Sequence, residues 1–358
     1  MLFVDPELSM MAKLRRPDPA SGTPQPGLHV LGPRLARLVP MVTPGNTRPG
    51  LRSLVQPLIK RAVRSAVADL FPRSAEPVAA EVTCQYGWYK LVDSRHRMVY
   101  IKDDYVLGAE LFGETPERMS QLEEQVIANV DTIAAVSLPL RDRLVAAGHR
   151  VELIPNGCDP DVYAKVDDAP LPADAPLRGP VAGLVGQIND RLDIGLLEAV
   201  ADTGAPVLVV GPIGPGYDPA RFLAFTERPN VCWVGGKPFE ELPSYLRLID
   251  VGLVPYVDNA FNRASFPLKT LEYLSAGRAV VSTPLPANDW LATDLIDVAT
   301  GPGPFAASVV RALREPRTDA LVQHRRSFAR EHTWQRRADQ LARLAGIGRG
   351  PVPGPYPS

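Results

Sequence analysis

The sequence of 358 residues has few cysteines and almost no net charge. Its three cysteines, Cys84, Cys158 and Cys232, form no Cys-x-x-Cys pair and are too few for a disulfide framework, which indicates a reducing compartment. The formal net charge is -1, with Lys and Arg spread along the chain. This balance excludes the broad basic field that nucleic-acid binding requires. We therefore expect a cytoplasmic protein with no nucleic-acid partner.

Targeting segments and metal-binding clusters are lacking as well. The first residues lead directly into Asp5 and Pro6, without the basic and apolar regions of a signal peptide. No apolar run approaches the roughly 18 residues of a transmembrane helix, so any membrane contact is expected to be peripheral. The five histidines show no zinc-binding spacing. Asp159-Pro-Asp161 matches a metal-binding Asp-x-Asp pattern, but its place after Pro155-Asn-Gly157 predicts a turn.

Short β-branched runs alternate with helical patterns along most of the chain, which predicts an α/β protein with parallel sheets and crossover helices. In the first half, the expected strands are residues 28–31, 38–42, 78–84, 98–101, 132–136 and 151–154. In the second half, they are residues 181–185, 207–210, 231–234, 251–254 and 279–282. The later strands are nearly all apolar, as expected when helices cover both faces of a sheet.

A Pro- and Asp-rich segment near the middle separates these two halves. Residues 167–179 follow neither a helix nor a strand period, which is typical of an interdomain linker. Two doubly wound domains are therefore expected, one on each side of the linker. Residues 346–358 are rich in Gly and Pro, with little apolar surface to bury, and are expected to be disordered.

One segment of the first half has the pattern of a basic amphipathic helix. Within residues 51–70, apolar side chains recur at helical spacing, and Arg52, Lys60, Arg61 and Arg64 lie largely off that stripe. Such a helix packs against the sheet of its own domain with a solvated basic face, or it rests on an anionic membrane. Both interpretations stand at this point.

The segment from residue 250 to 283 has the pattern strand, loop, helix, strand. Pro267 suits the first helical turn, and Gly277 suits the left-handed residue that ends a helix. The free N–H groups of that first turn would form an anion site at the carboxyl edge of the sheet, which fits a diphosphate. Lys269 adds a cation that needs a compensating anion there, and Glu272 can accept two hydrogen bonds from a vicinal diol such as a ribose. The alternative is an ordinary crossover helix whose Lys and Glu face water.

The run Ala264-Ser-Phe-Pro-Leu-Lys-Thr-Leu-Glu-Tyr-Leu-Ser-Ala-Gly277 resembles the donor-site segment of GT-B glycosyltransferases, particularly the retaining group called group one or family four. Further passages follow the order of that family: residues 131–137, 151–159, 181–193, 231–238 and 328–334. The resemblance implies metal-independent transfer of a sugar from a nucleotide-diphosphate sugar to a glycan or lipid-linked acceptor, with retained configuration. It implies no cofactor besides that donor.

The same resemblance implies roles for individual residues. Gly186 would let the backbone approach the donor closely, Arg191 would be a second phosphate ligand, and Lys237 lies in the turn that reads the nucleotide base. The implied donor-binding residues are Gly186, Arg191, Lys237, Pro267, Leu268, Lys269 and Glu272. Asp104, in the doublet after the strand at 98–101, is the candidate for catalysis or acceptor contact. Its alternative role is a helix cap.

The chain departs from the family pattern in two places. Relatives often carry a glutamate eight positions before the second one, where this chain has Ala264, so a contact to the donor sugar is expected to be missing. Residues 2–6 resemble the second strand of the family, so either the N-terminal domain lacks its first strand or the start of the chain is assigned too late. Two other functions therefore stay open: a degenerate sugar-nucleotide-binding or scaffold protein, and a non-hydrolysing nucleotide-sugar epimerase.

With this resemblance, five parts are predicted in a GT-B-like fold whose two Rossmann-like domains face a cleft. They are an acceptor-side domain, a linker, a nucleotide-sugar-binding domain, helices that cross back to the first domain, and a disordered tail. Their ranges are 1–163, 164–179, 180–320, 321–345 and 346–358.

Overall fold

The structure is a computed structural model that describes residues 1–6, 8–9, 25–42, 55–72 and 76–347. The chain forms two compact units. The first unit consists mainly of Met1–Tyr100 and Glu114–Ile133, and the second mainly of Ile101–Gly113 and Ala134–Arg343. The domain ranges given above stay a prediction, and most of the expected disordered tail lies outside the described residues.

A six-stranded parallel sheet forms the centre of the second unit. Its order is β12-β11-β10-β13-β14-β15, so the strand order reverses between β10 and β13. In open parallel sheets, ligands bind at the carboxyl ends of the strands beside such a reversal. The strands are β10 (Val181–Val185), β11 (Val207–Val210), β12 (Val231–Trp233), β13 (Ile249–Val254), β14 (Ala279–Ser282) and β15 (Ile296–Val298).

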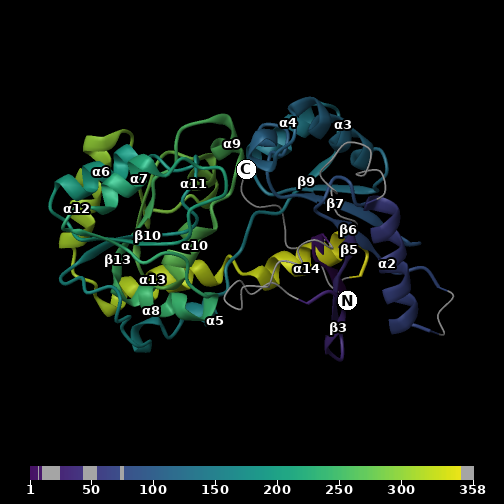
Figure 1. Ribbon diagram of the computed structural model, residues 1–358, viewed down its shortest axis with the longest axis horizontal. Coiled ribbons are helices and arrows are strands. Elements are labelled where there is room, and N and C mark those ends of the chain that lie inside the picture. Colours follow the sequence, from purple (N-terminus) through teal and green to yellow (C-terminus); the bar gives the residue numbers. More distant parts are fainter. Residues whose placement is uncertain (7, 10–24, 43–54, 73–75, 348–358) are drawn as a thin grey trace. The chain divides into compact units, whose positions relative to one another are not determined.

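Helices cover both faces of this sheet (Figure 1). One face carries α6 (Ile194–Asp202), α7 (Ala220–Thr226) and α12 (Pro302–Arg314), which share one hydrophobic core with the strands. The other carries α8 (Leu242–Leu248), α10 (Leu268–Ser275) and α13 (Asp319–Arg330). This coverage explains why the strands are almost entirely apolar and buried, as the sequence predicted.

The other described helices that lie wholly or mostly in the second unit are α4 (Leu138–Ala146), α5 (Pro160–Tyr163), α9 (Ala260–Ala264), α11 (Pro286–Leu291) and α14 (Trp334–Leu344). This unit also has 3₁₀ turns at Ala109–Phe112, Val166–Asp168 and Phe239–Glu241.

The strands near the N-terminus form two small sheets. β1 (Leu2–Val4), β4 (Leu35–Val39) and β3 (Gly27–Gly32) make one, in the order β1-β4-β3, and β2 (Leu8–Ser9) pairs with β5 (Met41–Val42). β3 and β4 run antiparallel, so the expectation of parallel sheets is wrong for this pair. The connection through Pro33 and Arg34 is too short for a crossover helix, and a short connection can only join antiparallel strands.

A four-stranded sheet follows in the order β6-β7-β8-β9. Its strands are β6 (Glu81–Thr83), β7 (Arg97–Ile101), β8 (Thr132–Ala135) and β9 (Val151–Leu153), and α3 (Pro116–Ile127) lies between β7 and β8 in the chain. The α/β class predicted from the sequence is confirmed.

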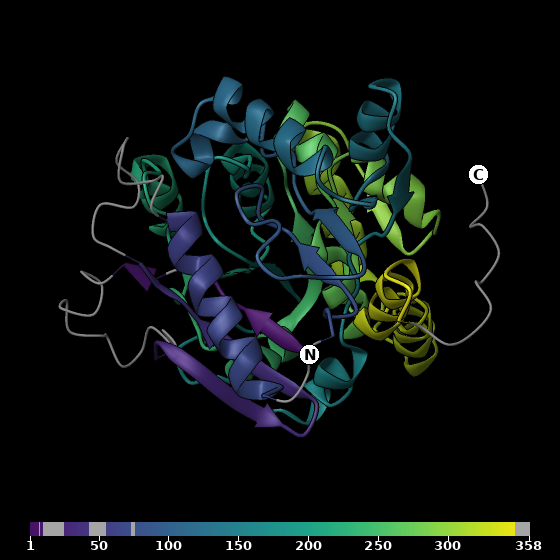
Figure 2. The same ribbon diagram turned by 90° about the vertical axis from the view of Figure 1, so that its right-hand side faces the viewer.

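Helix α2 (Val55–Leu70) is the described part of the predicted amphipathic helix. It buries Val55, Ile59 and Val63 against Leu38 and other residues of the first unit, beside the purple strands in Figure 2. The core interpretation of this stripe therefore matches the structure from Val55 onward. Its first turn, with Leu51 and Leu54, lies outside the described residues.

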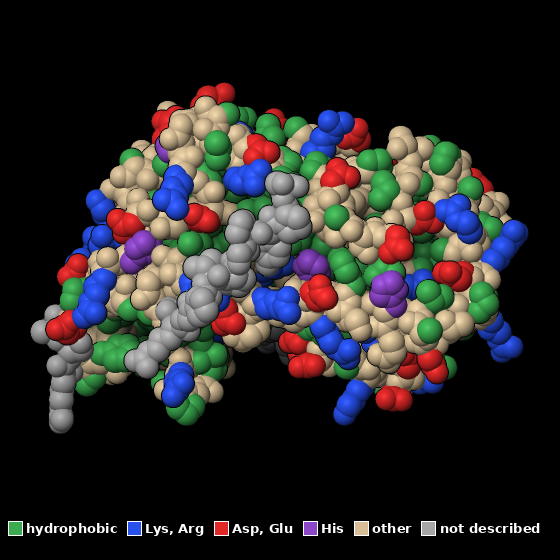
Figure 3. Space-filling model, turned by 180° about the vertical axis from the view of Figure 1, so that it is seen from behind, with side chains coloured by type: hydrophobic (Ala, Val, Ile, Leu, Met, Phe, Trp, Pro, Cys, Tyr) green, Lys and Arg blue, Asp and Glu red, His purple; other side chains and the backbone are tan. Residues whose placement is uncertain are grey.

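The distribution of surface charge and the length of the helices are the next two features. On the face drawn in Figure 3, acidic and basic side chains are interspersed, and no single-sign field dominates it. In the part of the chain that the structure describes, no helix is both long and apolar enough to cross a membrane.

Candidate functional site

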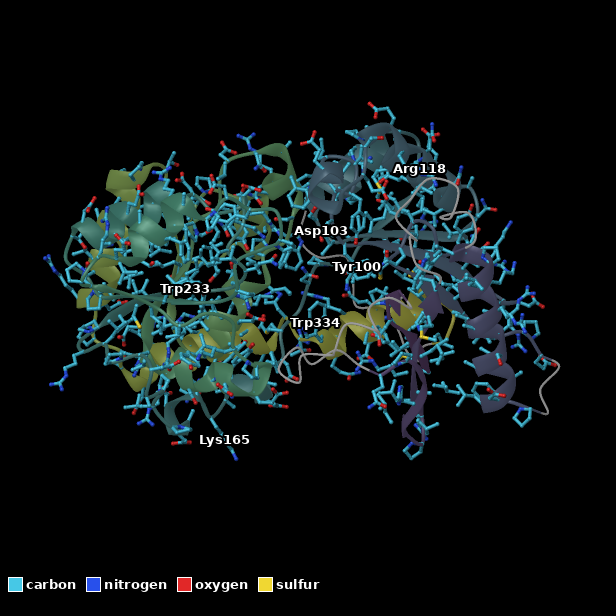
Figure 4. The ribbon with its side chains drawn as sticks, viewed as in Figure 1. Tyr100, Asp103, Arg118, Lys165, Trp233 and Trp334 are labelled. Atoms are coloured by element: carbon cyan, nitrogen blue, oxygen red, sulfur yellow. The ribbon has the colours of Figure 1, made fainter. Side chains whose placement is uncertain are left out.

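A cavity of about 420 Å³ lies at the carboxyl edge of the six-stranded sheet, beside the reversal between β10 and β13. We call it the sheet-edge cavity. Asp103 and Trp334, both labelled in Figure 4, contribute to its wall. Its other polar and predicted residues are Lys102, Tyr105, Asn156, Gly186, Gln187, Asn189, Arg191, Tyr256, Ser265, Pro267, Leu268 and Lys269. Five of the seven predicted donor-binding residues therefore line one cavity.

Two glycines bring backbone segments together beneath this cavity. Gly186 follows β10 at φ +157, and a Cβ there would lie 3.8 Å from Cε of Lys269. Gly211 follows β11 with the same φ, and a Cβ there would lie 1.7 Å from the carbonyl oxygen of Gly186. Trp233, labelled in Figure 4, donates from Nε1 to the carbonyl of Gly211 at 2.9 Å. The two backbone segments can approach this closely only because residue 211 is glycine, and the close approach of the Gly186 backbone to a donor stays a prediction.

Arg191 is held rigidly by uncharged partners. Its Nε donates to Oδ1 of Asn262 and its Nη2 to Oγ of Ser265, both at 2.9 Å. The guanidinium carbon lies 4.9 Å from the ring centre of Tyr256 and 5.1 Å from that of Phe261. These four contacts fix the orientation of the guanidinium without cancelling its charge. Such a preorganised cation suits an anionic ligand.

Helix α10 presents an uncapped N-terminus to the cavity. Pro267 occupies the N-cap with φ -63 and ψ 120, one residue ahead of the predicted first turn, because its extended ψ places it outside the helix. Its side chain makes no capping hydrogen bond, so the first N–H groups of α10 lack a side-chain cap there. At the other end, Gly277 has φ +77 as predicted, and the N–H of Arg278 donates to the carbonyl of Tyr273 at 2.9 Å.

Lys269 and Glu272 form an ion pair at 2.6 Å, three residues apart on α10. Their side chains are 25% and 18% exposed, so the interpretation in which both merely face water does not fit. Glu272 supplies the anion that a lysine near a helix N-terminus requires. Tyr163 forms a side-chain hydrogen bond with Glu272, and its pKa is raised, chiefly by burial of the phenol.

Lys237, Glu272 and Asp104 are not among the residues that line the sheet-edge cavity. Nζ of Lys237 is 2.5 Å from Oδ2 of Asp174, and this hydrogen bond raises the pKa of Lys237 to about 12. Asp104 is 2% exposed; its Oδ1 accepts from the N–H of Leu107 at 3.0 Å and its Oδ2 lies 3.3 Å from Nε of Arg143. The geometry of Asp104 is that of a turn cap, and its catalytic role stays a prediction.

Asp103, the neighbour of Asp104, is the carboxylate that lines the cavity. Burial raises its pKa, while the charges of Arg191 and Lys102 act in the opposite direction. The sequence draws attention to the Asp103-Asp104 doublet, but which of the two carboxylates lines the cavity depends on the geometry of the turn that they form. Asn262, which is fully buried and orients Arg191, was missed because no local motif marks it.

Ala264 is 4% exposed and does not line the cavity, whereas the next residue, Ser265, does. The carbonyl of Ala264 accepts a hydrogen bond from Oγ of Ser137 at 2.5 Å. The predicted loss of a glutamate contact to the donor sugar at this position stays a prediction.

The Asp-x-Asp pattern at Asp159 is a helix cap. Its Oδ1 accepts from the N–H of Asp161 at 3.3 Å at the start of α5, as the turn interpretation predicted. Among the described residues, no group of three His, Cys, Asp or Glu side chains is placed to hold a metal ion. None of the three cysteines forms a disulfide in the structure. Metal independence stays a prediction.

Comparison with known proteins adds to this geometry. Residues 180–315 match the sequence model of the family described as Glycosyl transferases group 1. These residues are a group 1 glycosyl transferase domain. TuaH of Bacillus subtilis (strain 168), named as a glycosyltransferase of teichuronic acid biosynthesis, is 30% identical over 235 residues, which cover 63% of this chain and 59% of TuaH. The chain thus spans about three fifths of that relative's length.

Solved structures show the fold around the glycosyl transferase domain. Sucrose-phosphate synthase from Thermosynechococcus elongatus aligns with a TM-score of 0.68 at 17% identity, over 89% of this chain and 85% of that chain. HepE from Anabaena, in complex with UDP and glucose, aligns with a TM-score of 0.63 at 15% identity, over 87% and 86%. These similarities cover 89% and 87% of this chain and confirm the GT-B-like fold predicted from the sequence.

Proposed function

We propose that the protein is a glycosyltransferase that binds a nucleoside-diphosphate sugar in the sheet-edge cavity. The observation that carries the proposal is the convergence of Arg191, Lys269 and the uncapped N-terminus of α10 on one cavity. All three favour an anion, and they lie where parallel α/β sheets bind nucleotides. Glu272, one turn further along α10, is the proposed partner of the ribose diol.

The proposed reaction places negative charge on the departing diphosphate. The bond between the anomeric carbon and the diphosphate oxygen breaks, its electron pair stays on that oxygen, and the acceptor hydroxyl bonds to the sugar while losing its proton. Cations at the diphosphate lower the barrier, and Arg191, which its hydrogen bonds hold in place, needs no rearrangement when the charge develops. In the proposal these cations take the role of a divalent metal, and the configuration of the sugar is retained.

The acceptor is proposed to be a glycan or a lipid-linked glycan of the cell envelope. The support is the name of TuaH, which refers to an envelope polymer. We also propose that the protein works in the cytoplasm, where its three cysteines, none of which forms a disulfide, would stay reduced.

Thermal unfolding with EDTA present tests the donor site. UDP, GDP, dTDP and ADP sugars are compared on the wild type, Arg191→Ala and Lys269→Ala, with Arg263→Ala as the matched control because Arg263 is exposed, pairs with exposed Asp258 and does not line the cavity. We expect one base to raise the melting temperature by several degrees, an effect lost in the first two variants and kept in the control. No shift with any sugar would refute the proposal.

A degenerate binding protein is the second candidate, and Ala264 favours it because relatives often carry a glutamate there. The two candidates differ in product formation. A glycosyltransferase releases nucleoside diphosphate in proportion to glycosylated acceptor, and a binding protein releases none. An epimerase would convert the sugar without any acceptor.

A further inference from the structure

The four tryptophans of the chain differ in what their rings contact. Trp233 donates from Nε1 to the carbonyl of Gly211 at 2.9 Å. Trp290 packs edge-on against two neighbouring rings, and Trp88 packs against the hydrophobic core of the first unit. Trp334 is 38% exposed and lines the sheet-edge cavity. Among the described residues, its indole N–H donates to no protein group and its ring stacks on no other aromatic ring.

The backbone of Trp334 is fixed against the segment that follows β9. Its N–H donates to the carbonyl of Cys158 at 2.9 Å, and the N–H of Cys158 donates to the carbonyl of His332 at 2.9 Å. Gly157 permits this contact, because a Cβ there would lie 2.7 Å from the backbone nitrogen of Trp334. A rigid backbone therefore holds this open indole at the start of α14, where Figure 4 labels it.

Trp334 shares its part of the cavity wall with uncharged residues. Asn156 precedes Gly157 in the chain, and its Nδ2 donates to the carbonyl of Phe266 at 2.8 Å. Asn156, Phe266 and Trp334 all line the sheet-edge cavity, as does Leu268, which is 36% exposed. This aromatic and apolar wall offers little to a phosphate, but it suits a neutral ligand with an apolar face.

We propose that Trp334 is a stacking platform for the acceptor, and that the unit which receives the transferred sugar is itself a pyranose, an inference that rests on the proposed function. A pyranose ring has a face of C–H groups and a rim of hydroxyls. The C–H face is buried on the indole, while the amide oxygen of Asn156, whose nitrogen is already engaged, accepts from a hydroxyl. A lipid phosphate has no such face and would gain little from this wall.

The acceptor fits this platform better than the donor does. The diphosphate of the donor is proposed to be held by Arg191, Lys269 and the N-terminus of α10. An acceptor sugar carries no phosphate, so its affinity has to come from apolar contact and hydrogen bonds. Trp334 is therefore a specificity-determining residue for the acceptor.

Fluorine NMR of the full chain labelled with fluorotryptophan tests the platform, because each of the four tryptophans gives its own resonance. Trp334→Phe assigns the resonance of Trp334. The ligands are the methyl α- and β-pyranosides of glucose, galactose and their N-acetylated amino sugars, each titrated with and without the nucleoside diphosphate chosen by the thermal panel. We expect at least one of them to shift the Trp334 resonance saturably and to move the other three much less.

Substitutions measure how much the ring contributes. Trp334→Ala should weaken the binding of that pyranoside about tenfold, and Trp334→Phe, which keeps a smaller ring, about threefold. Neither should change the affinity for the nucleoside diphosphate by more than about twofold, whereas damage to the fold would weaken both ligands. The matched control is Phe71→Ala, because Phe71 is 54% exposed and does not line the cavity; it should change neither affinity by more than about twofold. Calorimetry measures both affinities.

The inference is overturned if no pyranoside of the panel moves the Trp334 resonance, or if Trp334→Ala keeps the wild-type affinity for the pyranoside. It is also overturned if a nucleotide sugar alone shifts this resonance and its nucleoside diphosphate does not, because the ring would then hold the donor sugar. Failure of the proposed function would look different: binding of pyranosides at Trp334 without binding of any nucleotide would refute the donor site and leave the sugar platform standing.

Discussion

The strands of the two units differ in how deeply their side chains are buried. In the second unit, six parallel strands lie between two layers of helices, and their side chains are almost all buried. In the first unit, the sheet β1-β4-β3 leaves Phe3 54%, Val30 69% and Leu31 59% exposed. The family match, residues 180–315, falls within the second unit. A sheet buried on both faces constrains each residue more tightly, and this constraint is what makes its sequence recognisable.

The largest expected effect concerns the close backbone approach in the second unit. Gly211→Ala would place Cβ 1.7 Å from the carbonyl of Gly186, at a φ of +157 that disfavours alanine. We expect a loss of about 3 kcal/mol or more in the free energy of unfolding, because backbone must move. The counterpart in the first unit is Gly32→Ala, where nothing lies within 4 Å, and we expect a change of at most about 0.5 kcal/mol.

Urea unfolding of the full chain measures both glycine variants. Equal losses in Gly211→Ala and Gly32→Ala would remove the distinction between the two units on which this comparison rests.

A core substitution in the first unit tests the same comparison, because it should destabilise that unit and leave the second unit nearly unchanged. Ile59 is fully buried in the stripe of α2, so Ile59→Ala should cost about 2–4 kcal/mol in that unit. Hydrogen exchange read by mass spectrometry should show faster exchange in Met1–Tyr100 and little change in residues 181–298.

The control for Ile59→Ala is Arg61→Gln, an exposed neighbour on α2, which should shift the unfolding free energy by less than about 0.5 kcal/mol. If the apolar stripe served a membrane instead, Ile59→Ala would keep the stability and weaken binding to anionic vesicles.

The smallest expected effect is a response of the second unit to acid. His332 accepts a hydrogen bond at Nδ1 from Nη2 of Arg337 at 3.2 Å and packs near Trp290 and Phe328. Burial, with the charge of Arg337, lowers its pKa from 6.5 to about 4. The fold therefore favours neutral His332: this stability is complete above pH 6.5 and is lost as pH falls toward 4, because the unfolded chain takes up the proton first.

Between pH 7 and pH 5, this histidine should contribute about 1 kcal/mol to the loss of stability, a reduced value because the ring is partly exposed. His332→Gln keeps an acceptor and cannot take up the proton, so its stability should fall less over the same range. Urea titrations at the two pH values measure the difference, and parallel losses in both proteins would contradict this assignment.

The strands of the second unit could be predicted closely because continuous apolar runs bounded by Gly and Pro leave little choice. β15 was missed because it has only three residues and contains Asp297. In the first unit, Pro40 divides the expected strand at 38–42 into β4 and β5, since proline donates no hydrogen bond to a sheet. The antiparallel pairing of β3 and β4 depends on the turn between them, which strand patterns do not specify.

In the candidate site too, some residues could be predicted from the local sequence, whereas other contacts join residues that lie far apart in the chain. Gly186 and Lys269 follow from local rules, because one ends a strand and the other begins a helix at the same edge of the sheet. The partner of Lys237 is Asp174, which lies 63 residues away, and the anchors of Arg191 lie more than 70 residues away. Contacts of this kind depend on how the elements pack and leave no periodic signal in the sequence.

The predicted linker, residues 164–179, affects where the chain can be cut to obtain the second unit alone. Asp167 accepts from Arg278 at 2.7 Å and from Arg326 at 2.8 Å, and Arg278 is fully buried. The composition of residues 167–179 is typical of a flexible linker, yet Asp167 in this segment neutralises Arg278 inside the second unit. A shorter polypeptide that begins at residue 180, where the family match begins, would bury that arginine without its counter-ion, which costs several kcal/mol. The smallest polypeptide that can fold as the second unit therefore starts before Val166, inside what the composition marks as a spacer.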